Sequence, residues 1–361
     1  MTSSPRHAAG VTALLCAALL VVAACGSGAS GGTQAATRAV SAQQCAKNRS
    51  AGTITYASPF GYDASAGILD VFVAEKLRYF QNQCLTVRFV TNSPQSTELV
   101  SSGRATVSSI GSAADDLEAV ANGANVVGVA TFGAVSDYAI LTRPGITRLP
   151  QLEGGTFGYH FTVPVSILEM LRVAGAQPSK IDMVDTTNYD PNQLVQGHVD
   201  GLQAYQSNEP LILRAEHQRF NEFTPADLGV KGTFNVEIFN RAFLGKHRSA
   251  AAAFVRAELH AFDYCAGHAR ACINIEAGYA RESGATYDVS HEGAVWALES
   301  KLARGHTLPG QGVGVQSQAE WQPEAQALAQ YQIVKAVPSL GTWEDTTLAA
   351  SLYHGKTLAW P

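Results

Sequence analysis

The fold is decided by the stretch Thr53-Ile54-Thr55-Tyr56-Ala57 together with Leu85-Thr86-Val87-Arg88-Phe89-Val90. Both pieces are short and rich in β-branched and aromatic residues, which is typical of strands. Between them, apolar side chains recur at helical spacing, at Ile68, Leu69, Phe72, Val73 and Leu77. A strand, a helix and a strand in this order form a βαβ unit, whose strands are parallel. The sequence therefore predicts an α/β fold.

The alternation of strands and helices continues outward from this unit. Strands are predicted over 105–110, 125–131 and 137–142, and helices over 96–101 and from Ser112 onward. A second set follows Arg143-Pro144-Gly145, with strands over 156–159, 181–184 and 201–205 and helices over 163–173 and 191–196. Beyond residue 240 the periodicity predicts helices over 248–265, 268–281, 288–304 and 320–334. Strands near 138–143 and 234–239 flank the second set, and we interpret them as hinge crossings.

The N-terminus has the pattern of a targeting segment. Arg6 precedes an uncharged apolar run over 11–24, which is shorter than the roughly 20 residues of a membrane-spanning helix. The run ends at Cys25 in a pattern that resembles a lipobox, and a Gly- and Ser-rich stretch follows. We therefore expect a lipoprotein signal peptide over 1–24, a lipid on Cys25 and a flexible tether over 25–44. An ordinary signal peptide with an incidental Cys25 is the alternative.

Composition limits the classes of function. The chain has 361 residues, 46% hydrophobic and 15% charged, so the body can bury a sizeable core in two domains or one large one. The net charge is −5 and there is no run of Lys or Arg, so no nucleic-acid partner is expected. We expect a monomer on the outer face of the cell membrane, attached to the membrane through the lipid anchor.

Four cysteines follow Cys25, and an even number in an exported chain suggests disulfides. None of them forms a CxxC pair, and neither a metal site nor a cofactor is expected. Cys45 and Cys84 each precede a predicted strand, and adjacent parallel strands start at the same edge of a sheet. Cys265 and Cys272 flank a predicted corner between helices. These positions favour the pairs Cys45–Cys84 and Cys265–Cys272, while the other pairings and free thiols stay open.

Four stretches together resemble one known family. They are 73–87, 99–107, 149–159, and 196–201 with Asn208-Glu209-Pro210. Their order and spacing are similar to those of periplasmic solute-binding proteins of ABC importers, in the group that binds nitrate, sulfonates, taurine and thiamine precursors. The resemblance covers about residues 52–260. It implies a small-molecule solute as ligand, and an ABC permease with its ATPase as partner.

The same resemblance implies a two-lobe periplasmic-binding-protein fold of type II with hinge crossovers, and the sequence adds C-terminal helices. We expect lobe 1 to comprise 45–142 and 235–361, and lobe 2 to comprise 143–234. Ligands of open α/β sheets bind at the carboxyl ends of the strands. That rule selects the following candidate ligand-binding residues: Ser58, Phe60, Tyr62, Asp63, Ser109, Gly111, Ser112, Phe132, Tyr159, Phe161, Thr162, Tyr189, Tyr205, Asn208 and Glu209, with Asp137 and His160 beside them.

The candidate residues are rich in rings and lack cations. No Lys or Arg falls within 58–63, 108–112 or 159–163, which favours a flat neutral or cationic organic molecule, such as a pyrimidine, over nitrate or a sulfonate. Asp63 and Glu209 are suited to pair with an amine on the ligand, although a helix cap or a salt bridge between lobes would also explain them. Ser112 begins a helix, whose free N–H groups suit an anion or a carbonyl.

Rival functions have weaker support in the sequence. There is no GxSxG, P-loop or HExxH motif, and no catalytic residue is predicted. The thiamine-precursor group also includes a pyrimidine-synthesis enzyme, but its cysteine-rich motif is not found in this chain. A sulfonate, taurine or nitrate binder of the same family and a sensor lipoprotein that does not transport remain as alternatives.

Overall fold

The computed structural model describes residues 40–186, 190–337 and 339–361. All of them belong to one compact unit, Arg38–Pro361. The predicted signal peptide, the lipidation site Cys25, most of the predicted tether and Tyr189 lie outside the described residues. In the part of the chain that is described, no helix is both long and apolar enough to cross a membrane.

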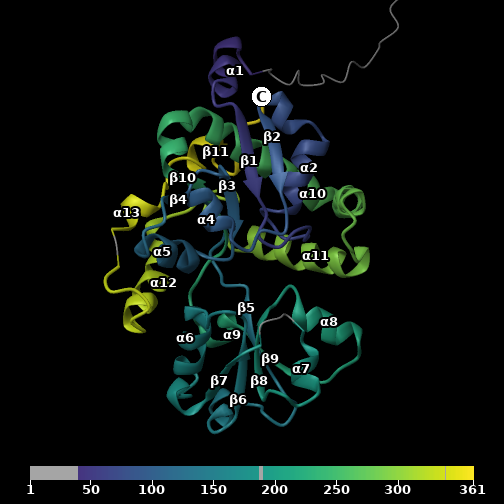
Figure 1. The fold of residues 1–361 in the computed structure, drawn as a ribbon, viewed down its shortest axis with the longest axis vertical. Coiled ribbons are helices and arrows are strands. Elements are labelled where there is room, and N and C mark those ends of the chain that lie inside the picture. The colour runs from purple at the N-terminus through teal and green to yellow at the C-terminus, as the bar shows by residue number, and fades with distance from the viewer. Residues whose placement is uncertain (1–39, 187–189, 338) are drawn as a thin grey trace, which may run out of the picture. The chain divides into compact units, whose positions relative to one another are not determined.

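The first sheet contains the predicted βαβ unit and is drawn in the upper half of Figure 1. Its strand order is β2-β1-β3-β10-β4. The strands are β1 (Thr53–Ala57), β2 (Thr86–Val90), β3 (Val107–Ile110), β4 (Val126–Gly133) and β10 (Phe234–Asn240). β1 pairs in parallel with β2 and β3, which confirms the prediction, whereas β10 runs antiparallel to β3 and β4.

The second sheet repeats this plan, in the lower half of Figure 1. Its order is β7-β6-β8-β5-β9. The strands are β5 (Tyr138–Thr142), β6 (Thr156–Tyr159), β7 (Asp182–Asp185), β8 (Gly201–Tyr205) and β9 (Asn221–Phe223). β6 is parallel to β7 and β8, and β5 is antiparallel to β8 and β9. Each sheet thus combines four mutually parallel strands with one antiparallel strand that enters from the other sheet.

The border between the sheets differs from the predicted one. The sequence prediction placed residues up to 142 in lobe 1, but β5 pairs with Gly201–Tyr205 of the second sheet. The chain crosses between the sheets over 134–137 and 229–233, next to the strands that we had interpreted as the crossings themselves. The two crossings run close together, since a Cβ on Gly232 would lie 2.9 Å from the Cβ of Ser136. Antiparallel pairing absorbs β5 and β10 into the sheets, and the short loops between strands make the crossings.

Helices cover both sheets. Beside the first sheet lie α1 (Ala42–Arg49), α2 (Leu69–Lys76), α3 (Tyr79–Asn82), α4 (Ser96–Ser101), α5 (Ala113–Ala121), α10 (Arg241–Ser283), α11 (Val289–Gly305), α12 (Gln318–Gln330) and α13 (Leu340–Trp343). Beside the second lie α6 (Val165–Val173), α7 (Asn192–Val195), α8 (Glu209–Ala215) and α9 (Pro225–Leu228). Short 3₁₀ turns, at Leu149–Leu152, Pro178–Lys180 and Ala350–Leu352, and the hairpin β11 (Tyr353–His354) and β12 (Thr357–Leu358) complete the chain.

One predicted boundary changes in the helical parts. The tether was expected to reach residue 44, but α1 begins at Ala42, where Ser41 accepts a hydrogen bond from the N–H of Gln44 and caps the helix. The corner expected between helices over 248–265 and 268–281 is confirmed, because the backbone of α10 leaves helical geometry at His268, and it does so again at His247. The element α10 thus consists of helical segments joined at kinks.

Both predicted disulfides are present. Cys45–Cys84 links α1 to the residue ahead of β2, and Cys265–Cys272 spans the kink of α10. Their Cα atoms lie 5.2 and 5.7 Å apart, within the usual range for such bonds.

The main core lies between the first sheet and the helices α2 and α10. Tyr56 of β1 and Phe80 stack on Phe254 of α10, with ring centroids 6.3 and 4.8 Å away. Trp321 of α12 covers another part of this sheet and donates a hydrogen bond from Nε1 to Thr131 Oγ1 at 3.1 Å. The second sheet has a smaller core of its own around Phe157, which is fully buried.

Candidate ligand-binding site

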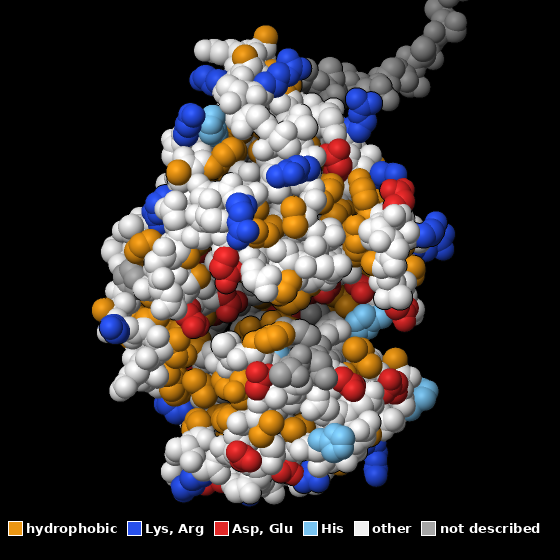
Figure 2. Space-filling model, in the orientation of Figure 1, with side chains coloured by type: hydrophobic (Ala, Val, Ile, Leu, Met, Phe, Trp, Pro, Cys, Tyr) orange, Lys and Arg blue, Asp and Glu red, His pale blue; other side chains and the backbone are white. Residues whose placement is uncertain are grey.

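A cavity of about 200 Å³ lies where the carboxyl ends of the strands of both sheets meet. We call it the acidic cavity. It is lined by Phe60, Asp63, Ser65, Gly111, Asp137, Tyr138, Tyr205, Ser207, Asn208, Asn235, Val295 and Glu299. Figure 2 shows acidic and hydrophobic side chains gathered around the hollow in the middle of this face. Its size suits a small molecule.

One wall of the acidic cavity consists of three rings. Tyr138, at the start of β5, stacks on Tyr205, at the end of β8, with centroids 4.9 Å apart. Their hydroxyl oxygens lie 3.3 Å from each other. Phe60, from the loop after β1, meets Tyr205 edge-on at 6.2 Å and is 41% exposed. Because Phe60 comes from the first sheet and the tyrosines from the second, a flat ligand can contact rings of both.

The acidic character of the cavity comes from three carboxyl groups. Asp63 belongs to the loop after β1, Asp137 to the first crossing and Glu299 to α11. Glu299 Oε2 accepts hydrogen bonds from Ser65 Oγ at 2.5 Å, Ala66 N at 2.8 Å and Asn235 Nδ2 at 3.0 Å. These donors hold the Glu299 carboxyl at the cavity wall.

Asp137 is buried, with 6% of its surface exposed. Ser207 Oγ donates to its Oδ2 at 2.8 Å, while Oδ1 is buried with no hydrogen-bond partner among the described residues. Asp63 Oδ1 is buried and unpaired in the same way. Burial, followed by repulsion from Glu299, holds the pKa of Asp137 well above its ordinary value. Burial and the nearby Glu292 do the same to the pKa of Asp63.

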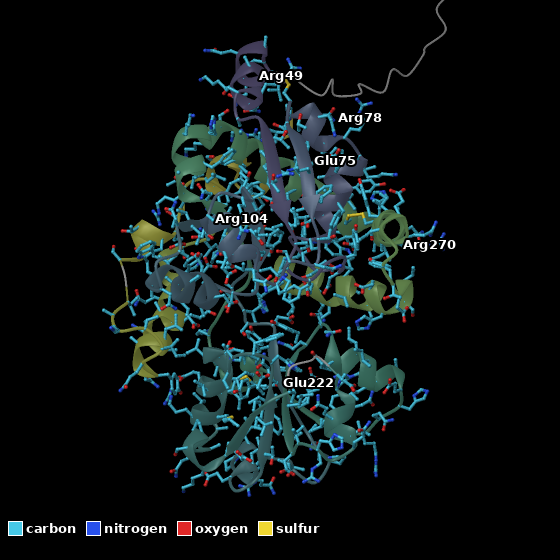
Figure 3. The ribbon with its side chains drawn as sticks, viewed as in Figure 1. Arg49, Glu75, Arg78, Arg104, Glu222 and Arg270 are labelled. Carbon is cyan, nitrogen blue, oxygen red and sulfur yellow. A yellow bond between two sulfur atoms is a disulfide. The ribbon has the colours of Figure 1, made fainter. Side chains whose placement is uncertain are left out.

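A second cavity adjoins the first and shares Phe60, Gly111, Tyr138 and Tyr205 with it. It too contains acids. Burial raises the pKa of Asp115 to about 6 and that of Glu324 to about 8. No Lys or Arg is among the described residues that line either cavity. Figure 3 shows the labelled cations Arg49, Arg78 and Arg270 at the outside of the molecule.

The predicted site residues divide into two groups. Phe60, Asp63, Gly111, Tyr205 and Asn208 line the acidic cavity, and Asp137 lies with them. Ser112, Phe161 and Thr162 line the second cavity, together with His160. These residues follow five strands, β1, β3, β4, β6 and β8, so the rule that ligands bind at the carboxyl ends of strands selects one continuous region.

Other predicted residues lie outside both cavities. Phe132 is buried in the core, with its ring 5.8 Å from that of Phe262, and Tyr62 packs on Phe72 at 5.1 Å. The hydroxyl of Ser58 donates to Gly61 O and closes a turn. Ser109 packs against Gly67, and Tyr159 packs against the core of the second sheet. Successive side chains of a strand point to opposite faces, so a residue near a strand end can face the core instead of the ligand.

Glu209 also lies outside the cavities, although its place in the Asn-Glu-Pro motif had favoured contact with the ligand. It is the first residue of α8 and is fully buried. Its Oε2 accepts a hydrogen bond from Tyr205 N at 2.8 Å, and its Oε1 lies 3.8 Å from His160 Nε2. Burial raises the pKa of Glu209 to about 7. Glu209 thus positions the Tyr205 backbone at the edge of the ring wall.

The sequence prediction missed six lining residues: Ser65, Tyr138, Ser207, Asn235, Val295 and Glu299. A signal existed for Glu299, because Val295, Trp296, Glu299 and Ala303 form the buried stripe of α11, and an acid within an apolar stripe is unusual. Among the described residues, no group of three or more His, Cys, Asp or Glu side chains is placed to hold a metal ion.

Solved structures share the fold at low sequence identity. The ligand-binding component of an ABC-type import system from Staphylococcus aureus, with zinc bound, is 14% identical, with a TM-score of 0.62 over 82% of this chain and 98% of that one. The periplasmic aliphatic sulphonate binding protein from Escherichia coli is 16% identical, with a TM-score of 0.61 over 81% and 96%. The desulfurization enzyme DSZB is 12% identical, with a TM-score of 0.55 over 83% and 98%.

These likenesses confirm the predicted α/β periplasmic-binding-protein fold. They concern the fold alone, since the same architecture serves binding proteins and an enzyme. No curated protein sequence matches the chain. Residues 66–271, more than half of the chain, match the family described as NMT1/THI5 like, and the chain belongs to that family.

Proposed function

We propose that this protein is the solute-binding component of an ABC-type import system. It captures a small organic molecule between two lobes and delivers it to a permease and its ATPase. The lobes are the two sheets with their helices, joined by the crossings at 134–137 and 229–233. A ligand that contacts both lobes favours the closed arrangement over the open one.

The observation that carries this proposal is the ring wall of the acidic cavity. Phe60 and Tyr205 come from different sheets, and their centroids lie 6.2 Å apart. A flat molecule that reaches both would join the lobes. The rings support a heteroaromatic ligand that resembles a pyrimidine precursor of thiamine, in line with the family to which the chain belongs.

An aliphatic sulfonate is the second candidate, favoured by the likeness to the sulphonate binding protein from Escherichia coli. A sulfonate would be held best by Arg, Lys or a helix N-terminus. Ser112 at the start of α5 offers such an N-terminus, but its hydroxyl already bonds the carboxylate of Asp115 at 3.0 Å. The acids around this position oppose an anion, so we rank the sulfonate second.

The location follows from the sequence. We propose that a lipid on Cys25 attaches the protein to the outer face of the membrane and keeps it near the permease. Changing Cys25→Ala should release the protein into the medium and leave the affinity for solute unchanged.

The test is native mass spectrometry of the purified protein, followed by identification of any molecule that copurifies. A solute recovered chemically unchanged supports binding, whereas a solute that is converted during incubation supports an enzyme. Phe60→Ala and Tyr205→Ala should each weaken the complex. Phe243→Ala, a half-buried ring on α10 away from both cavities, is the control. Wild-type binding by both site variants would contradict this site.

A further inference from the structure

We propose that the solute carries a positively charged group with N–H donors, such as an ammonium, amidinium or guanidinium, and that Asp63, Asp137 and Glu299 hold this group. This inference rests on the proposed function and names the class of solute. It also separates this protein from binders of anions.

The first support is the convergence of three carboxyl groups from distant parts of the chain. Asp63, Asp137 and Glu299 lie on three different elements and line one cavity. Two more acids are nearby: the Glu292 carboxyl accepts a hydrogen bond from Ala64 N at 2.8 Å, and the Glu209 carboxyl accepts one from Tyr205 N at 2.8 Å. The fold thus gathers acidic side chains where the two sheets meet.

The second support is the unpaired oxygen of Asp137. This side chain is 6% exposed, lines the cavity, and has a buried Oδ1 without a partner among the described residues. Leaving a buried carboxylate oxygen without a donor is costly, and buried charges in proteins are normally paired. The other charged residues of the cavity wall are acids, so the wall supplies no compensating cation. A ligand with a positive charge and an N–H donor would supply the cation and the hydrogen-bond donor that the cavity wall lacks.

The chemistry of the missing partner narrows the class of ligand. A quaternary ammonium has no N–H and cannot hydrogen-bond Asp137 Oδ1 or Asp63 Oδ1. An amidinium or guanidinium is planar, donates several hydrogen bonds and can bind a carboxylate with two of them. Tyr138, Tyr205 and Phe60 beside the acids also attract a cation through their ring faces. A planar organic cation can therefore hydrogen-bond the carboxyl groups of the cavity and contact its aromatic rings.

The experiment compares three probes of similar size and different charge: benzamidine, benzamide and benzenesulfonate. The full chain, freed of bound solute by dialysis, is titrated with each at pH 8 by calorimetry and by thermal shift. We expect benzamidine to bind at least about tenfold more tightly than the other two, as one charge-assisted hydrogen bond to a buried acid provides. Equal responses to all three probes, including no response, or a preference for benzenesulfonate would overturn the inference.

Substitutions locate the charge recognition. Asp137→Asn and Glu299→Gln keep the shape of the side chains and should each weaken benzamidine binding by about tenfold or more. Glu258→Gln is the matched control, since Glu258 is a fully buried acid of the same unit that does not line the cavity. If the site variants bind benzamidine as well as the control does, these carboxyl groups do not hold the cation.

The outcome for the copurifying solute separates this inference from the proposed function. A cationic solute supports both. A neutral or anionic solute, bound at the ring wall, overturns the cation inference and leaves the proposed solute-binding function standing. A protein that copurifies with nothing and is stabilised by no compound of a broad metabolite library contradicts the proposed function itself.

Discussion

Two clusters of buried carboxyl groups occupy this molecule, and they differ in what surrounds them. In the acidic cavity, Asp63 and Asp137 line a space that a ligand can fill, and each has a buried carboxyl oxygen without a hydrogen-bond partner among the described residues. In the core of the first sheet, Glu237 of β10 and Glu258 of α10 are completely buried, influence each other's titration and line none of the cavities described above. Burial raises the pKa of both core glutamates well above the ordinary value.

The comparison teaches how a protein can accommodate buried acids in two ways. A pair that meets inside the core can share a proton and remain uncharged, since like charges at contact cannot both ionise. Acids that line an open space can instead be compensated by a cation that binds from solution. Substitutions in the core pair should therefore affect folding only. The cavity acids should favour ligand binding and lower the stability of the free protein.

The largest expected effect is the dependence of cation binding on pH. Asp137 faces Asp63, Glu209 and Glu299, and burial and these acids raise its pKa, so below that pKa it is protonated and must lose a proton to pair with a cation. The affinity for benzamidine should rise from pH 5.5 to 8.5, by up to roughly tenfold per pH unit for each proton released. Calorimetry in two buffers of different ionisation enthalpy measures the proton release directly. A flat profile would contradict charged recognition by these groups.

The next effect concerns the stability of the free protein. A carboxyl group whose pKa is raised by folding stabilises the folded state below its unfolded pKa of about 4, and this contribution is lost as the pH rises through the folded pKa. Asp137→Asn should therefore raise the free energy of unfolding at pH 8 by about 1–3 kcal/mol, the cost of a poorly compensated buried group. Urea unfolding at pH 5 and pH 8 tests this, with the gain larger at pH 8. Destabilisation at both pH values would indicate that the Asp137 carboxyl group has a stabilising partner in the folded protein.

A smaller effect is expected in the core pair. Burial raises the pKa of Glu258 and favours its protonated, uncharged form, and in Glu258→Gln a neutral amide takes the place of that carboxyl group, so the free energy of unfolding should change by about 1 kcal/mol or less. Benzamidine affinity should equal that of the wild type, because Glu258 does not line the cavity. Thermal unfolding and calorimetry measure the two quantities. A loss of affinity comparable to that of Asp137→Asn would show that the two clusters act as one.

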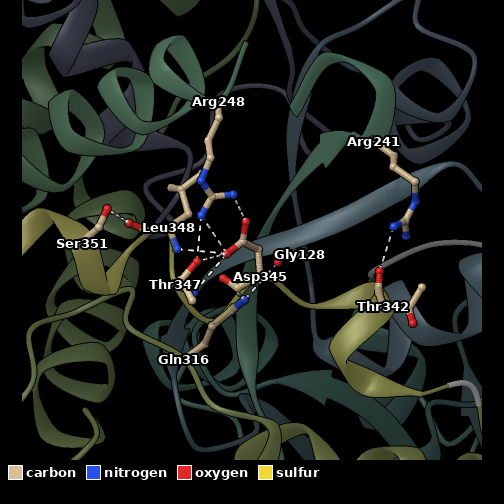
Figure 4. Close-up of polar contacts among 9 residues, drawn as sticks. All are labelled: Gly128, Arg241, Arg248, Gln316, Thr342, Asp345, Thr347, Leu348 and Ser351. Carbon is tan, nitrogen blue, oxygen red and sulfur yellow. Dashed lines mark hydrogen bonds and ion pairs between the residues drawn. The ribbon is translucent and has the colours of Figure 1, made fainter. Parts of the chain in front are cut away.

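The smallest effect on stability is expected for an acid that is already paired with a cation of the protein. Figure 4 shows Asp345 held by Arg248 and by Thr347 in the C-terminal segment. Partial burial alone would raise the pKa of Asp345, but the hydrogen bonds from Arg248 and Thr347 outweigh it and lower the pKa to about 2. The contribution of this pair is present above about pH 4 and is lost as the pH falls toward 2.

Arg248→Met should cost about 0.2–1 kcal/mol at pH 7, the usual value of an exposed ion pair. The difference from wild type in urea unfolding should shrink at pH 3. A difference that stays constant with pH would assign the effect to packing of the Arg248 side chain on its neighbours.

The sequence predicted much of the fold because its signals are local. Alternation in Thr53–Ala57 and helical spacing over residues 68–77 identify elements whose neighbours lie close in the chain. The positions of the cysteines before two strands and around a helix corner favoured the two disulfide pairs that are present. The border at residue 142 was wrong because β5 pairs with strands that come about 60 and 80 residues later, at Gly201–Tyr205 and Asn221–Phe223. Antiparallel insertion of one strand into a distant sheet has no local signature.

The candidate site was predictable only in outline. The strand-end rule selected Phe60, Asp63 and Tyr205, which do line the acidic cavity, but it also selected Phe132, which packs in the core. Orientation decides this difference, and a shift of one residue turns a strand side chain to the opposite face. Glu209 shows the same limit, since its carboxylate turns back to bond Tyr205 N.

By itself the sequence determined the α/β alternation, the exclusion of Lys and Arg from the loops at the strand ends and the resemblance to a solute-binding family. Only the tertiary structure decided that Asp63, Asp137 and Glu299 surround one cavity, because they lie on a loop, a crossing and a helix separated by more than half of the chain. The physical reason is that the sequence shows which residues at a strand end are acidic or basic. The cost of burying such a charge depends instead on the distant groups that the fold places next to it.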